Sequence, residues 1–204
     1  MKQLSREYRR ESADPAPTMT RAQAFYSARL EHVFDNCFGA RYHTRLVGGA
    51  PEPSYQPASA TQREHRLHYR EDFFASALHE TAHWCIAGAV RRTLADFGYW
   101  YAADGRGPEA QRAFEAVEDK PQALEWFFSR ACGFRFRLSV DNLDLQHGSL
   151  PDTRRFAQRV LAQARRWQVA GLPPRAECFY RALCAEFGTV VMPGQLELSL
   201  ADLD

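Results

Sequence analysis

Apolar side chains recur every three to four residues in five stretches of the chain, and this spacing predicts helices. The predicted helices cover Thr20–Phe38, Phe73–Gly88, Glu109–Cys132, Pro151–Ala170 and Pro173–Gly188. Gly39 is expected to end the first of them. Pro121 lies inside the third, where it either kinks the helix or begins a new one.

Shorter stretches alternate apolar and polar residues, which is typical of strands. The alternation predicts strands at Tyr42–Val47, His65–Arg70 and Phe134–Val140. The aromatic run Asp96–Tyr101 fits either a strand or the wall of a pocket. Gly48–Ala60 is predicted to be a loop because it contains two glycines and three prolines.

Together these elements predict an α+β fold, with a single helix-rich domain and a small sheet. A jelly roll, the usual scaffold of 2-oxoglutarate-dependent oxygenases, needs many regular strands and is not expected. The catalytic metal-binding domain is predicted at residues 19–190, between a mobile N-terminal tail at residues 1–18 and a C-terminal tail at residues 191–204. A chain of 204 residues is long enough for one substantial core.

The charges are nearly balanced, with 26 Lys and Arg residues against 25 Asp and Glu residues and a net charge of +1. Direct binding of nucleic acid through bulk charge is therefore not expected. The sequence shows no signal peptide and no apolar run long enough to span a bilayer, which predicts a cytoplasmic protein that does not bind membranes.

The candidate chemistry lies in the helix predicted at Phe73–Gly88, which contains the sequence His-Glu-x-x-His. His79 and His83 are four residues apart, so on a helix both imidazoles lie on one face and can bind one metal ion. Both fall along the apolar stripe of the helix and are expected to face the interior. Glu80 lies next to the metal without binding it. Two core histidines bonded to backbone carbonyls are the alternative, but a pair at ligand spacing around a glutamate favours a metal site.

A carboxylate is the expected third ligand. It would give either the two-His-one-Glu set of zinc peptidases or the facial triad of non-haem iron oxygenases. Glu115 and Glu118 are the candidates because theirs is the one acid-bearing helix that also has a long apolar stripe, and Glu118 is favoured because it directly precedes the break expected at Pro121. Glu115 is the reserve candidate, whereas Glu109 and Glu125 are predicted to be solvated.

The identity of the metal determines the role predicted for Glu80. With zinc, Glu80 takes a proton from a bound water, and the reaction is hydrolysis. With Fe(II), three positions remain for substrate, water and dioxygen, and Glu80 orients a ligand or moves a proton. The motif alone favours zinc, because it occurs more often in hydrolases. A factor-binding module with a structural metal and a metal-dependent nuclease are further alternatives.

Longer stretches of the sequence resemble the bacterial elongation factor P hydroxylases. The resemblance is carried by Phe74–Glu80, His83–Gly88, Asp96–Tyr101, Asp104–Arg106, Phe114–Leu124 and Asp141–Leu143. These ordered matches extend from about Tyr26 to Trp167 and are far more specific than a five-residue metal motif.

The resemblance implies an iron-dependent monooxygenase that takes part in post-translational modification for translation. Its substrate and partner would be β-lysylated elongation factor P, hydroxylated on the modified lysine, with Fe(II) as cofactor and dioxygen as co-substrate. The implied metal ligands are His79, His83 and Glu118. The implied fold resembles a small bacterial metal-dependent endoribonuclease, with a zincin-like metal helix. A zinc-dependent metallopeptidase is the alternative prediction.

Overall fold

The computed structural model describes residues 25–98, 108–139 and 153–203 of the chain. These residues form a single helix-rich domain with one small sheet, so the predicted α+β class is confirmed. The predicted N-terminal tail and the aromatic residues Tyr99–Tyr101 lie outside the described residues. The predicted domain boundaries and the likeness to zincins and the endoribonuclease stay predictions.

The sheet consists of β1 (Thr44–Ala50), β2 (Ser54–Gln56) and β3 (His65–Arg70). β3 is the middle strand, parallel to β1 and antiparallel to β2. Leu67 of β3 is in register with Leu46 on one side and Tyr55 on the other, and all three side chains are buried. The prediction of a loop at Gly48–Ala60 is wrong in part, because this stretch contains the end of β1 and all of β2.

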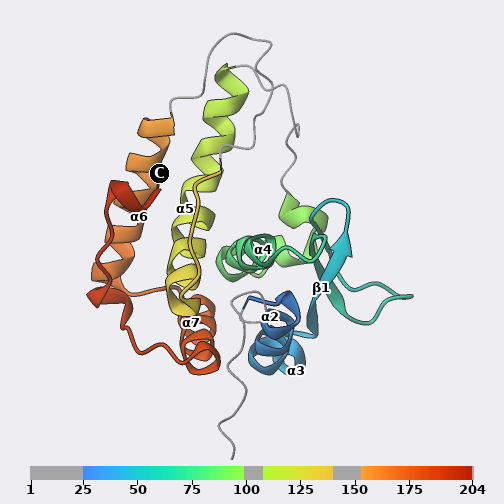
Figure 1. Ribbon diagram of the computed structural model, residues 1–204. Coiled ribbons are helices and arrows are strands. Elements are labelled where there is room, and N and C mark those ends of the chain that lie inside the picture. Colours follow the sequence, from blue (N-terminus) through green and yellow to red (C-terminus); the bar gives the residue numbers. More distant parts are fainter. Residues whose placement is uncertain (1–24, 99–107, 140–152, 204) are drawn as a thin grey trace, which may run out of the picture.

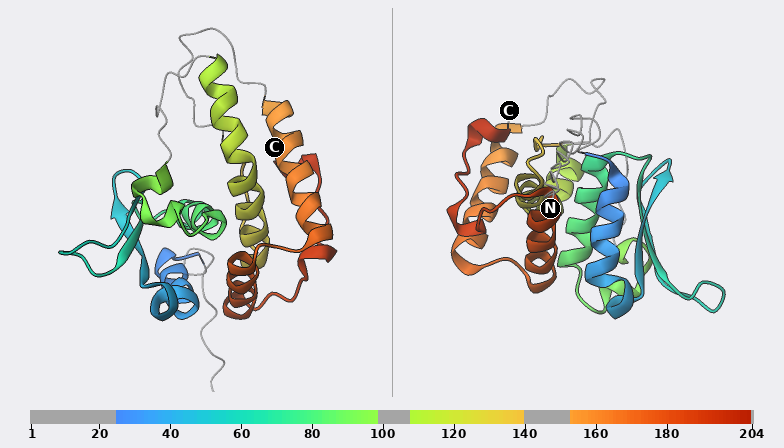
Figure 2. Two further views of the ribbon diagram at one scale, coloured as in Figure 1. Left: turned by 180° about the vertical axis from the view of Figure 1, so that it is seen from behind. Right: turned by 60° about the horizontal axis from the view of Figure 1, so that its bottom comes forward.

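Helices pack in layers on the sheet. α2 (Ser27–Phe34) and α4 (Phe74–Ile86) contact the sheet, and α4 also contacts α5 (Pro108–Cys132) and α7 (Pro174–Phe187). α6 (Thr153–Ala170) packs on α5 at the far side of the domain. α4 therefore lies at the centre, between the sheet and α5 (Figures 1 and 2). None of the helices in the described ranges combines the length and apolar character needed to cross a membrane.

The first helix differs from its prediction at the C-terminal end. α2 continues without a break through a π-helical stretch, Asp35–Gly39, into the short α3 (Ala40–Tyr42). Gly39 therefore does not end the helix, and the chain turns at His43, whose φ is 48°. A Cβ atom at Gly39 would overlap the side chain of Asp35, which pairs with Arg45. The glycine thus makes room for that ion pair.

The strand predicted at Phe134–Val140 is wrong, because residues 134–139 form no strand. Their alternation has another cause: Phe136 is buried and Arg135 and Arg137 are exposed, so the segment covers the core with one side only. Gln122 of α5 holds the segment. Its Nε2 donates to the carbonyl of Ser139 (2.7 Å) and its Oε1 accepts the Ser139 N–H (3.0 Å).

α5 is one helix that continues through Pro121, although proline cannot donate to the carbonyl four residues earlier. The helices predicted at Pro151–Ala170 and Pro173–Gly188 are confirmed as α6 and α7.

The C-terminal end of α4 is held by a cation from α7. Nη2 of Arg175 donates to the carbonyls of Trp84, Cys85 and Ala87 at 3.2, 2.9 and 2.5 Å. A guanidinium at this end of a helix satisfies carbonyls that lack helical partners and complements the helix dipole. Arg175 therefore helps to fix α4 relative to α7.

Candidate metal centre

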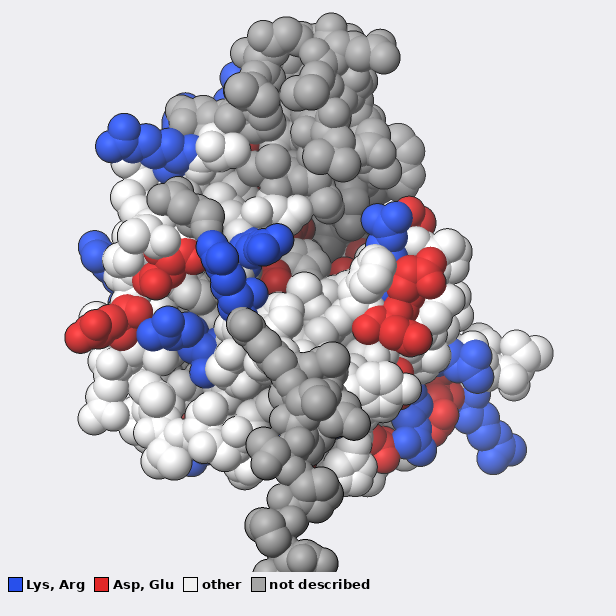
Figure 3. Space-filling view, viewed as in Figure 1, with Lys and Arg blue, Asp and Glu red and all other residues white. Residues whose placement is uncertain are grey.

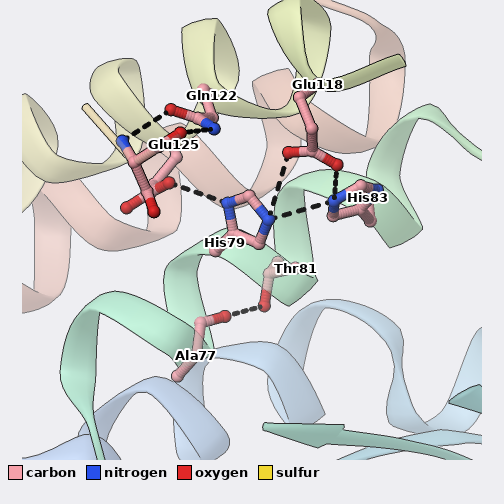
Figure 4. A network of polar contacts seen from close by, with 8 residues as sticks. Ala77, His79, Thr81, His83, Glu118, Gln122 and Glu125 are labelled. Atoms are coloured by element: carbon pink, nitrogen blue, oxygen red, sulfur yellow. Dashed lines mark hydrogen bonds and ion pairs between the residues drawn. The ribbon is translucent and has the colours of Figure 1, made fainter. Parts of the chain in front are cut away.

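α4 places the two histidines of the motif side by side. The Nε2 atoms of His79 and His83 are 3.0 Å apart, and the ring centroids are 4.7 Å apart (Figure 4). Their side chains are 24% and 15% exposed. The expectation that they face the interior is correct only in part, because they lie at the edge of the core, where small molecules can reach them.

α5 adds a carboxylate to this pair. Glu118 Oε2 lies 3.4 Å from His79 Nε2, and Oε1 lies 3.2 Å from His83 Nε2. The Glu118 side chain is only 3% exposed. Its Oε2 is buried and forms no hydrogen bond within the described part of the chain. The structure therefore brings together His79, His83 and Glu118, with one ligand atom from each within 4.8 Å of the others.

These three side chains fit a metal ion. Atoms bound to one ion by bonds of about 2.1 Å lie about 3.0–3.4 Å apart for bond angles between about 90° and 110°. The two imidazole nitrogens are 3.0 Å apart, and they lie 3.2 and 3.4 Å from the two different oxygens of the Glu118 carboxylate. An ion between the ligand atoms would also give the buried Glu118 Oε2 a partner. Two imidazole nitrogens and one carboxylate oxygen suit Fe(II) as well as zinc.

The charges of the centre are strongly coupled. Burial alone would lower the pKa of His79, but the hydrogen bond with Glu125 and the charges of Glu118, Glu125 and Glu80 raise it to about 10. Burial alone would raise the pKa of Glu118, but His83, through its charge and a hydrogen bond, and His79 lower it to about 2. Three carboxylates thus surround two histidines, an excess of negative charge that favours a bound cation.

Glu115, the reserve candidate, lies one turn away from Glu118 on α5. It is buried, and its Oε1 accepts a hydrogen bond from Gln111 Nε2 at 3.3 Å. It is not among the three residues whose ligand atoms converge.

The prediction that Glu125 is solvated is wrong. Glu125 is buried, and its Oε2 lies 2.9 Å from His79 Nδ1. The sequence contains a signal that would have indicated this position: Glu118 and Glu125 are seven residues apart, so on one helix they lie on the same face two turns apart. A glutamate two turns after a candidate ligand therefore also faces α4.

Glu80 is half-buried and lies close enough for its charge to act on both histidines. Burial is the largest cause of the raised pKa of Glu80, and the neighbouring carboxylates Glu118 and Glu125 raise it further. Within the described ranges, this carboxyl group forms no hydrogen bond.

A comparison with protein families matches residues 33–196 to the family described as Elongation factor P hydroxylase. The chain belongs to this family. The Elongation factor P lysine hydroxylase of Haemophilus influenzae is 48% identical over 157 residues, which cover 77% of this chain and 86% of the relative. The resemblance found in the sequence is therefore confirmed.

Membership of the elongation factor P hydroxylase family gives the zinc metallopeptidase alternative no support. The five-residue motif occurs in both classes of enzyme, so it is the rest of the chain that separates them.

A pocket of about 400 Å³ opens beside the metal centre of this family member. His83 lines it together with apolar side chains from the end of α4 and from α5, among them Ile86, Val117 and Pro121. Arg91 and Lys120 also line it. The pocket therefore gives a small molecule or an extended side chain a route to His83.

Arg91, Arg92 and Asp96, which follow α4, each bond within the chain. Arg91 donates to the carbonyl of Phe97 and Arg92 to that of Ala87, and Asp96 accepts the N–H of Tyr55. On the face shown in Figure 3, basic and acidic side chains are interspersed over the described residues.

Proposed function

We propose that this protein is a non-haem Fe(II)-dependent monooxygenase that hydroxylates elongation factor P on the lysine already extended by a β-lysyl group. The observation that carries the proposal is the convergence of His79, His83 and Glu118 in a member of the elongation factor P hydroxylase family. The name of the Haemophilus influenzae relative specifies a lysine of elongation factor P as the site of hydroxylation.

In this proposal His79 and His83 hold the ion through Nε2, and Glu118 holds it through its carboxylate. Fe(II) bound there would supply dioxygen binding and the redox chemistry by which one oxygen atom enters a carbon–hydrogen bond and the other leaves as water, with two electrons from an external reductant. Structural metal sites are usually closed by four protein ligands. The described residues bring together three, which favours a catalytic role over a structural one.

The carboxylates around the two histidines suit a cationic substrate, whereas Arg91 and Lys120 line the pocket beside His83. Glu80 presents a half-buried carboxyl group that can accept a hydrogen bond from an ammonium group of the modified lysine. Because its pKa is raised, the same carboxyl group can also hold a proton at a pH where an ordinary glutamate does not. Glu115 is less suited to this role, since it is buried and bonded to Gln111. Ile86, Val117 and Pro121 form an apolar wall of the pocket beside His83.

The direct test is the intact mass of β-lysylated elongation factor P after incubation with this protein, Fe(II), an external reductant and air. We expect a gain of one oxygen atom, which should be absent with His79→Ala and with His83→Ala. If protein shown by metal analysis to hold Fe(II) gives no gain in mass, the proposed function is wrong.

A further inference from the structure

Glu125 lies behind His79, on the side of the ring that faces away from the other ligand atoms (Figure 4). Its Oε2 contacts Nδ1 of His79 at 2.9 Å, whereas Nε2 of the same ring faces Glu118 and His83. The two ring nitrogens point in different directions, so Glu125 contacts a ligand and not the position of the ion. Accordingly, it is not one of the three converging residues.

The burial of Glu125 makes this contact energetically important. Its side chain is 9% exposed, and its ion-pair partner within the described residues is His79. A carboxylate taken out of water is costly unless a charged or hydrogen-bonding partner offsets the loss of hydration. The Glu125 carboxylate and the His79 ring are therefore held together, and each restricts the position of the other.

The two histidines of the motif differ in this respect. Nδ1 of His79 is held by Glu125, whereas Nδ1 of His83 forms no hydrogen bond within the described ranges. A carboxylate that accepts the second N–H of a metal-binding histidine fixes its tautomer and ring orientation and raises its basicity.

We propose that Glu125 is a positioning residue that accepts the Nδ1–H of His79, directs the bare Nε2 towards the metal and makes His79 the stronger of the two histidine ligands. This inference rests on the metal centre of the proposed function, but not on the reaction that the metal performs. It assigns α5 two contributions to the centre: Glu118 contacts the ion, and Glu125 contacts a ligand of the ion.

The first test measures the affinity of the full-length protein for Co(II), in competition with a chromophoric chelator. Loss of such an outer partner typically weakens metal binding about 10–100-fold, and we expect a loss of this size for Glu125→Ala. Glu125→Gln should lose less, because an amide oxygen still accepts the N–H but carries no charge. Asp119→Asn is the matched control: Asp119 is on the same helix but pairs with Arg159 of α6, so its change should leave the affinity unaltered.

A second readout follows the hydrogen bond itself. In the Zn(II)-loaded protein, which is diamagnetic, the Nδ1–H of His79 should give a downfield proton resonance that exchanges slowly with water. In Glu125→Gln this resonance should move upfield, and in Glu125→Ala it should broaden or disappear. A merely structural role of Glu125 would not move the resonance of one ring proton. The near-isosteric Glu125→Gln keeps the test valid if Glu125→Ala does not fold.

The inference is overturned if Co(II) affinity and the His79 resonance are unchanged in both Glu125 variants. It is also overturned if Glu125→Ala abolishes Co(II) binding as completely as His79→Ala, since Glu125 would then be a ligand itself. In a His79→Ala background, Glu125→Ala should weaken Co(II) binding no further, and an additional loss there would contradict action through His79. If the Fe(II)-loaded protein does not hydroxylate elongation factor P, the proposed function is wrong, but these metal-binding results are unaffected.

Discussion

α4 and α5 both supply candidate ligands to the centre, but these side chains come together for different physical reasons. On α4, His79 and His83 are neighbours because four residues make about one helical turn, so local geometry alone brings their rings together. On α5, Glu118 reaches the same point only because the whole helix packs against α4 in one register. A pair of ligands on one helix is thus a local property, whereas the third ligand is a property of the fold.

This difference extends to the side chains around the ligands. The α4 histidines are partly exposed, whereas Glu118 and Glu125 on α5 are buried. Glu125 contacts the His79 ring on the side away from the other candidate ligand atoms, whereas Glu118 faces the Nε2 atoms of both histidines. The two helices therefore contribute different groups to the candidate centre: α4 contributes imidazole nitrogens, and α5 contributes carboxylates.

The largest expected effect comes from the choice between the two candidate carboxylates of α5. Glu118→Gln should weaken Co(II) binding by more than the roughly 100-fold upper range of outer-partner changes, because it replaces an anionic ligand with a neutral amide. Glu115→Gln should change the affinity less than about threefold, since Glu115 bonds to Gln111 and does not reach the histidines. Competition titrations on the two variants measure the difference, and a reversed order would show that α5 packs in another register.

The carboxylates of α5 also affect the proton that His79 of α4 must lose when a metal binds. The raised pKa of His79, about 10, means that the metal-free protein holds this proton tightly. The proton on Nε2 must leave before a metal binds, so Co(II) affinity should rise about tenfold per pH unit between about pH 7 and 9.

The raised pKa of His79 also makes the stability of the metal-free fold depend on pH. Since the folded-state pKa is raised above the ordinary 6.5, the stabilisation from protonated His79 is fully present below pH 6.5 and is lost as the pH rises through about 10.

The proton that leaves His79 when a metal binds can be counted directly. A pH indicator should register about one proton released per Co(II) bound at pH 8. Binding without proton release would contradict the coupling of His79 to the α5 carboxylates.

The smallest expected effect on metal affinity comes from Arg175, which bonds to the C-terminal end of α4. Arg175→Ala removes the donor to three carbonyls at the end of this helix and should lower the free energy of unfolding by about 1–3 kcal/mol. Arg175→Lys should recover part of the loss. Urea unfolding measures both changes. The spacing of His79 and His83 within α4 should survive, so the Co(II) affinity of the folded variant should fall by much less than in Glu118→Gln.

Sequence reasoning succeeded where the determinant is local. The periodicity of α4, the His79–His83 pair and the courses of α6 and α7 follow from side-chain spacing along one helix. It failed where a distant partner decides the outcome. The alternation at Phe134–Val140 comes from burial of one side of a segment without a neighbouring strand, and Gly39 makes room for Asp35 instead of ending a helix.

The same distinction holds within the candidate site. Glu118 was favoured over Glu115 because of an expected break at Pro121, yet α5 is continuous there. Glu118 is close to the histidines for a different reason, which is its position on the face of α5 that packs against α4. That face also includes Glu125, and only the packing of the two helices shows that both carboxylates are buried beside the histidines.

Anomalous diffraction at the iron absorption edge, from crystals grown with Fe(II) in the absence of oxygen, tests most directly whether α4 and α5 share one ion. The account predicts a single strong peak about 2.1 Å from Nε2 of His79, Nε2 of His83 and a carboxylate oxygen of Glu118, with Glu125 on the far side of the His79 ring. A peak bound to Glu115 or Glu125, or no peak between the two histidines, would contradict it.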